Sequence, residues 1–200
     1  MVKSTLTFGL LLCSFLLKAN TLAPESVAQA ASERTLSQVI YNGAYQSIDY
    51  PMGDVSANIG VCTDVVIRAY RALGVDLQEQ VHKDMKANFA AYPSKRIWGL
   101  TRTDTNIDHR RVPNLRVFFA RHGQSLTVSD QPEDYQPGDI VSWRLSNGRP
   151  HIGIVSSEKN AQGTRYMIVH NIGLGPKTED QLFEYDITGH YRYFPEVPKA

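Results

Sequence analysis

The sequence predicts an α+β fold in which helices come first and an antiparallel β-sheet follows. Apolar residues recur at helical spacing directly after Gly60, and turn signals separate short β-branched runs after Pro137. The first thirty or so residues have the composition of a secretory signal. Without them roughly 170 residues remain, which is one domain's worth and enough to build a hydrophobic core.

The N-terminus has the pattern of a cleavable signal peptide. An apolar run from Leu6 to Leu17 follows a positively charged start at Lys3, and its twelve residues are too few to span a bilayer. Cys13 lies inside this run. The candidate cleavage positions are Ala19, Ala28 and Ala30. We therefore expect a signal peptide within residues 1–30, one mature domain over residues 31–200 without a stable membrane span, and a periplasmic or secreted location.

The charge of the chain is balanced. Two of the 21 basic residues and one of the 20 acidic residues lie in the first thirty positions, so the rest of the chain carries equal numbers of each. A net charge near zero gives no indication of binding to nucleic acid or to an anionic membrane. We expect no nucleic-acid partner and no cofactor, and the sequence does not indicate an oligomeric state.

Helical patterns occupy the first two thirds of the chain. Residues 31–49 carry a weak pattern, whereas the residues after Gly60 carry a much clearer one that Gly74 stops. Further helices are expected at about residues 78–91 and 116–122. The polar segment 101–113 has no periodicity, so we expect a long ordered loop there, and such loops are usually functional.

Turn signals and β-branched runs predict an antiparallel meander in the last third. Pro137-Gly138-Asp139 leads into the first strand, and Asn147-Gly148 predicts a hairpin turn. The expected strands are residues 140–145, 151–156, 166–171 and 191–194, with a further turn at residues 160–163. Helices followed by such a sheet are typical of a segregated α+β domain.

Cys62 is the one cysteine that export would leave in the chain, and it opens the clearest helix. Exported proteins normally pair their cysteines, so a single thiol points to a reactive group. The N–H groups of a helix N-terminus lower the pKa of a thiol and favour the nucleophilic thiolate. The alternative is a small buried hydrophobe without chemistry.

Two histidines are the best partners for this thiol. His151 begins a strand directly after a hairpin turn, where its ring is expected at the edge of the sheet, accessible to a facing helix. The base needs a third polar group to orient it, and the next strand ends in His170 and Asn171. We expect a catalytic set of Cys62, His151 and His170, with Asn171 as the alternative third member. The alternative is that both histidines only cap or end strands.

This arrangement resembles the NlpC-type cell-wall cysteine peptidases. The shared features are the helix-opening Cys62, the Pro-Gly-Asp turn, the strand-opening His-Ile-Gly-Ile-Val at residues 151–155 and a polar residue on the next strand. The resemblance implies a papain-like fold, with the nucleophile helix packed on an antiparallel β-sheet, and cleavage of peptidoglycan stem peptides. It also implies that Tyr50, twelve residues before the cysteine, lines the active site.

A closer resemblance is to the YijF-like family of exported bacterial proteins of unknown function. It rests on four segments: Gly-Val-Cys-Thr-Asp (60–64), Asn-Ile-Asp-His-Arg-Arg-Val-Pro-Asn-Leu (106–115), His-Asn-Ile-Gly (170–173) and Ile-Thr-Gly-His-Tyr-Arg-Tyr (187–193). The peptidases usually have Asp-Cys-Ser-Gly around the nucleophile, so Thr63 and Asp64 depart from their pattern. We expect both residues to contribute to substrate binding or to the oxyanion site in this chain.

The loop over residues 101–113 offers further candidates for substrate binding. Arg110 and Arg111, beside Asn106, present planar donors that suit a substrate carboxylate. The alternative is that the arginines form internal ion pairs that order the loop. His109 is a reserve candidate for the base. Asp104, Asp108 and His109 match no metal motif, so we expect no metal site.

The remaining residues of possible interest are expected to be structural. Trp98 and Trp143 are assigned to the core, and His82, His122 and His190 have no motif context. The function expected from the whole is an exported cysteine peptidase or amidase with a cell-wall peptide as its substrate. The alternatives are a papain-like acyltransferase, a lipid or polyamine amidase, and a non-catalytic cell-wall binding module.

Overall fold

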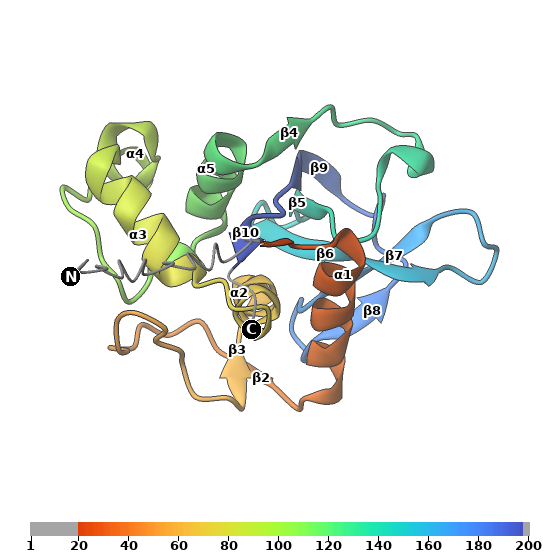
Figure 1. Cartoon of the computed structure of the whole chain (residues 1–200), viewed down its shortest axis with the longest axis horizontal. Helices are drawn as coiled ribbons and strands as arrows, with labels where there is room; N and C mark the ends of the chain where they lie inside the picture. Colours follow the sequence, from red (N-terminus) through yellow and green to blue (C-terminus); the bar gives the residue numbers. More distant parts are fainter. Residues whose placement is uncertain (1–19, 198–200) are drawn as a thin grey trace, which may run out of the picture.

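The computed structural model describes residues 20–197. The apolar run from Leu6 to Leu17, Cys13 and the cleavage candidate Ala19 lie outside the described residues. Within them, helices gather around a six-stranded antiparallel sheet, and the cysteine-bearing helix packs directly against a strand of that sheet (Figure 1). The expected α+β class, with the nucleophile helix on an antiparallel sheet, is confirmed.

Five α-helices lie in the described part of the chain. They are α1 (Pro24–Ser32), α2 (Cys62–Ala72), α3 (Leu77–Ala87), α4 (Ser94–Trp98) and α5 (Val112–His122). Short 3₁₀ turns add η1 (Glu33–Leu36), η2 (Phe89–Ala91), η3 (Asp108–Arg110) and η4 (Pro132–Asp134). No helix within residues 20–197 is long and apolar enough to cross a membrane.

The helix α2 follows the sequence pattern closely. Asp64, in its first turn, accepts a hydrogen bond from the backbone N–H of Val61 at 2.7 Å, which satisfies one of the donors that a helix start leaves open. Gly74 ends the helical segment with a φ of 80°, a conformation that glycine adopts without strain. Local signals therefore set both ends of the helix that carries Cys62.

The main sheet has the order β4-β9-β5-β6-β7-β8. Its strands are β4 (Gln124–Leu126), β5 (Ile140–Arg144), β6 (Pro150–Lys159), β7 (Tyr166–His170), β8 (Lys177–Glu179) and β9 (Asp186–Arg192). The expected meander is present from β5 to β8, but β9 then returns to pair with β5 on its other side. The strand β9 starts earlier than the strand that the sequence predicts at residues 191–194. The sequence did not predict β4 or β8.

Two small strand pairs complete the fold. Antiparallel β1 (Asn20–Thr21) and β10 (Glu196–Val197) join the two ends of the described chain. Parallel β2 (Ile40–Tyr41) and β3 (Ile59–Gly60) form directly before α2. The helical pattern expected over residues 31–49 holds only to the end of η1 at Leu36, since residues 37–49 contain no helix and only the short strand β2.

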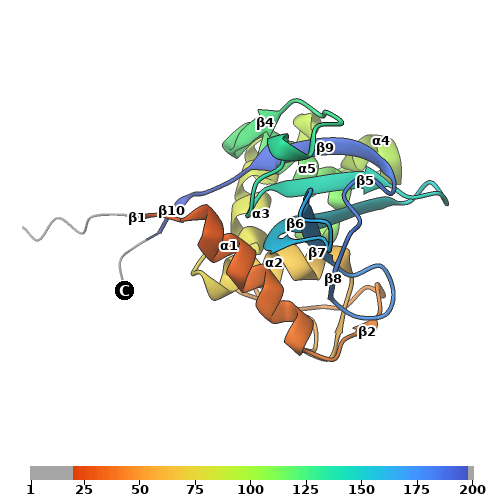
Figure 2. The same ribbon diagram turned by 90° about the vertical axis from the view of Figure 1, so that its right-hand side faces the viewer.

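The helix α1 extends the domain toward the N-terminus. Val27 and Ala31 are fully buried, and α1 lies beside α2 against β6 (Figure 2). The expected domain boundary at residue 31 falls inside α1, whose residues Val27 and Ala30 already belong to the core, and it stays a prediction. Cleavage after Ala28 or Ala30 would remove most of this helix.

The two faces of the sheet carry separate apolar clusters. The larger one joins β5, β6 and β7 to the helices through residues such as Ile152, Ile154 and Val169. The smaller one, on the other face, surrounds Trp143, whose indole N–H donates to the carbonyl of Leu182 at 2.9 Å. Trp143 is a core residue as expected. The same expectation for Trp98 is wrong, since its side chain is 38% exposed.

Candidate active site

Cys62 opens α2 and is 5% exposed. Burial raises the pKa of its thiol from 9.0 to about 12, although a hydrogen bond from the backbone of Ile152 acts in the opposite direction. The Asp64 carboxylate raises this pKa further, and the N–H groups of Thr63 and Cys62 lower it. The expected lowering of the thiol pKa by the helix N-terminus is wrong for the resting site, because burial outweighs the donors. Cys62 therefore rests as a neutral thiol.

His151 is the second residue of β6 and is 1% exposed. Its strand lies between β5 and β7, so the ring is at the end of an interior strand and not at the edge of the sheet. Trp143 is its direct neighbour across β5, with ring centroids 5.9 Å apart. Burial, followed by the charge of His170, lowers the pKa of His151 to about 3. The imidazole is therefore neutral at physiological pH.

A chain of three side chains leads from His151 across the sheet. His151 Nε2 lies 2.9 Å from Nδ1 of His170, the last residue of β7. His170 Nε2 lies 2.9 Å from Glu179 Oε2 on β8, a close charge contact whose N–H is not aligned for a hydrogen bond. Glu179 pairs with Ile168, two residues before His170, which explains why its side chain reaches the imidazole diagonally.

The order of these contacts defines the proton positions. A carboxylate accepts hydrogen bonds only, so Glu179 favours a proton on Nε2 of His170. The Nδ1 atom of His170 is then an acceptor and takes the N–H of His151 Nε2. This leaves Nδ1 of His151 with a free lone pair. Burial lowers the pKa of His170, and the charge of Glu179 raises it.

Gly153 is required where β6 and β7 approach each other. A Cβ atom at this position would lie 2.8 Å from the carbonyl oxygen of Val169 and 3.1 Å from Cβ of His170. Both distances are shorter than ordinary contacts, so a larger residue would displace β7. The glycine in the His-Ile-Gly-Ile-Val segment thus allows His170 to reach His151.

The structure brings Cys62 and His151 into the same region without joining their side chains. Helix α2 packs on β6, and the sulfur of Cys62 faces the backbone of Ile152, the residue that follows His151. No hydrogen bond between the two side chains occurs among the contacts of the described residues. Trp143, the neighbour of His151, belongs to the apolar cluster on the opposite face of the sheet from Cys62 and Ile152, so the two side chains must approach each other before the thiol proton can pass to His151.

Tyr41 and Arg149, like Glu179, are residues at this site that the sequence did not reveal. Burial raises the pKa of Tyr41 to about 12, and the charges of Cys62, Arg149 and Asp64 act on the same hydroxyl. The pairing of β2 with β3 places Tyr41 opposite Gly60, two residues before the cysteine. Arg149 lies in the hairpin before β6 and is exposed. The signal in the sequence that could have identified Tyr41 is that it is a tyrosine shortly before the cysteine.

Tyr50, the tyrosine chosen from the sequence, lies elsewhere. Its ring packs edge-on against His82 of α3, with centroids 5.1 Å apart. Burial raises its pKa, followed by the charge of Glu79, and the charge of Lys83 opposes this. These neighbours all belong to α3, and among the described contacts none joins Tyr50 to Cys62, so the assignment of Tyr50 to the oxyanion site stays a prediction. Tyr41 occupies the position beside the cysteine that was expected of it.

Asp64, Thr63 and Arg110 form a buried anchor under the start of α2. Both carboxylate oxygens of Asp64 accept from the Arg110 guanidinium, at 2.8 and 2.9 Å. The hydroxyl of Thr63 donates to the carbonyl of Arg110 at 3.1 Å. The three residues are between 1% and 8% exposed. The polar groups of these residues are engaged inside the protein, and the substrate-binding roles expected for them stay predictions.

The other loop candidates also serve internal contacts. Arg111 pairs with Asp108 at 3.2 Å and lies over the ring of Trp98. Asn106 accepts from the backbone N–H of Ile48 at 3.0 Å, so it fastens the neighbouring segment. The internal ion-pair alternative therefore describes the arginines, and direct substrate contact by Asn106 or Arg111 is not supported.

His109 does not serve as a second base. It is 2% exposed, and burial followed by the charge of Arg110 lowers its pKa to about 3. Arg71, near the far end of α2, acts on it as well, whereas Cys62 does not. The reserve role expected for His109 is therefore wrong. The nearby Asp104 and Asp108 contact each other, since Asp108 accepts the backbone N–H of Asp104 at 2.6 Å.

The histidines without motif context have structural partners. His190 lies 2.7 Å from Asp139 in the Pro-Gly-Asp turn, and His122 lies 3.2 Å from Asp84. His82 packs under Tyr50. Within residues 20–197 no group of three or more His, Cys, Asp or Glu residues is arranged to hold a metal ion.

Asn171 takes no part in the contact that His170, the residue before it, makes with His151. Its side-chain oxygen accepts the backbone N–H of Gly173 at 3.1 Å, and the residue is 1% exposed. Among the described contacts His170, and not Asn171, reaches His151. The Nδ2 atom of Asn171 is buried and has no hydrogen-bond partner among the residues that the structure describes.

Fold and site thus define an α+β protein in which a helix-opening cysteine faces a sheet that carries two linked histidines. The chain belongs to the family described as a domain of unknown function, DUF1287, whose model matches residues 28–193. Membership of the YijF-like family is confirmed. The uncharacterized protein YijF of Escherichia coli (strain K12) is 53% identical over 169 residues, which cover 84% of this chain and 81% of that protein.

One solved structure is also similar. The structure of NlpC1 from Trichomonas vaginalis matches with a TM-score of 0.45 and 16% sequence identity. The match covers 86% of this chain and 44% of that one, so this chain spans less than half the length of NlpC1.

Proposed function

We propose that this protein is an exported cysteine hydrolase that cleaves amide bonds of peptidoglycan stem peptides. The observation that carries the proposal is the 2.9 Å contact between His151 Nε2 and His170 Nδ1, next to the strand position that faces the sulfur of Cys62. A histidine oriented by a second polar group beside a helix-opening cysteine is the arrangement that nucleophilic catalysis requires.

In the proposed reaction the thiol of Cys62 attacks the carbonyl carbon of the substrate amide. Its proton passes to Nδ1 of His151, and a C–S bond forms as the carbonyl becomes an oxyanion. His151 then returns the proton to the leaving amine, and the C–N bond breaks. A water molecule hydrolyses the resulting thioester after losing a proton to His151, which restores the thiol and releases the acid.

The resting protonation states influence the order of these events. Burial holds Cys62 as a thiol and His151 as a neutral imidazole. Proton transfer to His151 therefore accompanies attack and does not precede substrate binding. The backbone N–H of Cys62 and the hydroxyl of Tyr41 are the proposed oxyanion donors. The raised pKa of Tyr41 keeps its hydroxyl protonated and able to donate.

Export is part of the proposal. The signal pattern over residues 3–17 supports it. The burial of α1 in the core favours cleavage near Ala19, since later cleavage would remove residues such as Val27 from the fold. We expect mass spectrometry of the periplasmic or secreted protein to find Asn20 at or close to its N-terminus. An intact N-terminus in the cytoplasm would contradict the export proposal.

A non-catalytic cell-wall binding module is the second candidate function. The burial of Cys62 and the raised pKa of its thiol favour it, because an inert thiol serves packing and not chemistry. Such a module would bind the same class of cell-wall peptides but would not cleave them.

Digestion of purified peptidoglycan separates the two candidates. We expect the wild-type protein to release new fragments that mass spectrometry identifies, and Cys62→Ala to release none while still sedimenting with the polymer. Sedimentation of both proteins without fragments would establish the binding module. If neither protein sediments with peptidoglycan or cuts it, both candidates are wrong.

A further inference from the structure

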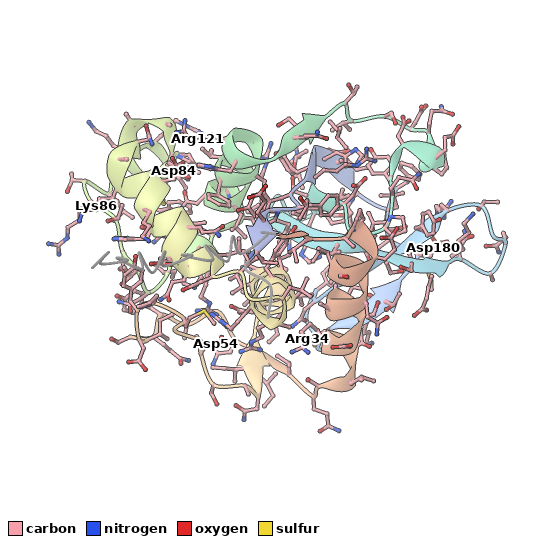
Figure 3. All side chains as sticks on the ribbon, viewed as in Figure 1. Arg34, Asp54, Asp84, Lys86, Arg121 and Asp180 are labelled. Atoms are coloured by element: carbon pink, nitrogen blue, oxygen red, sulfur yellow. The ribbon has the colours of Figure 1, made fainter. Side chains whose placement is uncertain are left out.

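A cavity of about 300 Å³ lies along α2 and has no assigned role. Its lining comes from four parts of the chain: η1 and the segment after it, residues 54–61, α2, and the segment after β7. Arg34 and Asp54, both in this lining, are labelled on either side of α2 in Figure 3. The cavity therefore lies at the junction of segments that are far apart in the sequence.

The charged residues of the lining carry more positive than negative charge. Arg34, Arg68 and Arg71 face the cavity together with the carboxylates of Asp54 and Asp64. Asp54 holds Arg68 at 2.9 Å and Arg71 at 2.7 Å. Asp64 is engaged by an arginine that does not line the cavity.

Arg34 is the arginine that these carboxylates do not reach. Its nearest carboxylate is that of Glu33, 4.0 Å away, whose side chain is 48% exposed. An exposed pair at this distance is weak, so the charge of Arg34 remains available to an anion in the cavity.

Three buried N–H donors belong to residues that line the same cavity. They are Nε of Arg34, Nε of Arg71 and Nδ2 of Asn171, and none has a hydrogen-bond partner within residues 20–197. Asn171 is 1% exposed, and Gly173 already occupies its side-chain oxygen, which leaves the Nδ2 group as the free donor. Buried donors without a partner are rare in folded proteins. A carboxylate has two oxygens that together accept up to about four hydrogen bonds.

We propose that this cavity binds a carboxylate group, held by the charge of Arg34 and by the free N–H donors of Arg71 and Asn171. Two arginines share the Asp54 carboxylate, so the cavity carries excess positive charge that an anion neutralises, and arginines pair well with the planar carboxylate group. The apolar side chains of Val39 and Pro176 also line the cavity, so the ligand is a compact acid with some apolar surface.

The position of the cavity indicates where the carboxylate comes from. Val61 and Asn171 line it, and they are the chain neighbours of Cys62 and His170. A substrate anchored here by a carboxylate extends toward the sulfur, and stem peptides carry several such groups. This assignment of the carboxylate to the substrate rests on the proposed function, whereas the binding of a carboxylate does not.

Direct binding tests the site without requiring turnover. Calorimetry compares N-acetylalanine, its uncharged amide N-acetylalaninamide and inorganic phosphate on the Cys62→Ala protein. We expect N-acetylalanine alone to bind, with a millimolar dissociation constant. Arg34→Gln should weaken this binding at least about tenfold, whereas Arg34→Lys retains part of the affinity.

The control Arg102→Gln removes an exposed arginine outside the lining and leaves binding unchanged. Equal binding of acid and amide, preferred binding of phosphate, no binding, or an unchanged affinity in Arg34→Gln overturns the site.

Kinetics then distinguish the two sources of the carboxylate. If it belongs to the substrate, N-acetylalanine inhibits digestion of stem peptides competitively, and Arg34→Gln raises KM with little change in kcat. Binding of N-acetylalanine that does not compete with the peptide overturns the substrate assignment and leaves a site for a free small acid. If no peptide is cleaved, displacement of a bound peptide by N-acetylalanine decides the same question.

Discussion

The Nε2 atom of His170 lies 2.9 Å from the Glu179 carboxylate, on the side of the ring opposite to His151. Glu179 thereby extends the pair of histidines into a chain of three groups, and its charge raises the pKa of His170. The carboxylate determines which nitrogen of His170 carries the proton. It acts on His151 only through that ring, which makes it a positioning residue.

We therefore expect Glu179→Gln to disturb the tautomer of His170. The glutamine amide donates as well as accepts, so it no longer favours a proton on Nε2 of His170. Nitrogen NMR of the imidazoles should show a mixed tautomer and a lower pKa for His170. Turnover of a peptide substrate should fall about tenfold in kcat, equivalent to roughly 1.4 kcal/mol, with KM unchanged.

Glu158→Gln is the matched control for this change, because Glu158 is an exposed glutamate near the end of β6. It should alter neither the NMR signals of His170 nor kcat. If Glu179→Gln leaves the tautomer of His170 as it is in the wild type, Glu179 has no positioning role.

The buried pair of Asp64 and Arg110 should contribute to stability and not to substrate binding. Arg110→Met removes one partner and leaves a carboxylate that is 2% exposed without its counter-charge. Loss of one member of a buried pair lowers the free energy of unfolding by about 3–5 kcal/mol. Urea denaturation monitored by circular dichroism measures this change.

Arg165→Met provides the comparison for this prediction. Arg165 pairs with Asp180 at 2.6 Å, but both side chains are one-third exposed, so the loss should be about 0–1 kcal/mol. A stable Arg110→Met protein with a raised KM for peptides would return Arg110 to the substrate-binding role that the structure argues against.

The parts of this fold that the sequence predicts are those with local signals. The α2 helix has its own start at Asp64 and its own stop at Gly74, and the strands from β5 to β7 follow turn residues. The α1 helix was missed because its small apolar residues, such as Ala28 and Ala31, are also typical of a signal cleavage region. Its burial depends on contacts with α2 and β6, which no local pattern indicates.

The residues of the candidate site also divide into those that local signals predict and those that depend on contacts between distant segments. His151 and His170 lie near the ends of predicted strands, so their proximity follows from the pairing of β6 with β7. Tyr41 reaches the site through a two-residue parallel pairing that no sequence periodicity shows. Arg110 looked free in the sequence because its partner lies 46 residues away. Contacts between segments that are distant in the sequence therefore determine which of the candidate polar residues are free to contact a substrate.

The buried histidines should make the protein less stable in mild acid. The pKa values of His109 and His151 are about 3 in the folded protein, against 6.5 for an exposed histidine. Below pH 6.5 the unfolded chain takes up protons that the folded chain does not. The free energy of unfolding should therefore fall as the pH falls from 6.5 toward 3, by up to about 1.4 kcal/mol per pH unit for each histidine.

Urea denaturation at a series of pH values measures this slope. His109→Gln removes one of the histidines with a lowered pKa, so it should make the slope smaller without changing the proposed reaction site. The raised pKa of Cys62 acts in the opposite range, because the unfolded thiol loses its proton above about pH 9 and the folded one does not. Stability should accordingly decrease again above pH 9, and Cys62→Ala should make the decrease between about pH 9 and pH 10 smaller, whereas the buried tyrosines add to it at higher pH. A stability that stays constant from pH 7 to pH 4 would show that these histidines are already protonated in the folded protein.

The last prediction concerns the close approach of β6 and β7. Gly153→Ala places a methyl group 2.8 Å from the carbonyl oxygen of Val169 and 3.1 Å from Cβ of His170, so β7 must move away. Overpacking of this kind lowers the free energy of unfolding by about 1–3 kcal/mol. The displacement also lengthens the contact between His151 and His170, so kcat should fall by more than the loss of folded protein explains. Gly43→Ala is the matched control, because the nearest atom to its new methyl group is Val61 Cγ1 at an ordinary 3.4 Å, and it should change neither stability nor the imidazole NMR signals. If Gly153→Ala is destabilised while His151 and His170 keep their wild-type NMR signals, the glycine serves only the packing of the sheet.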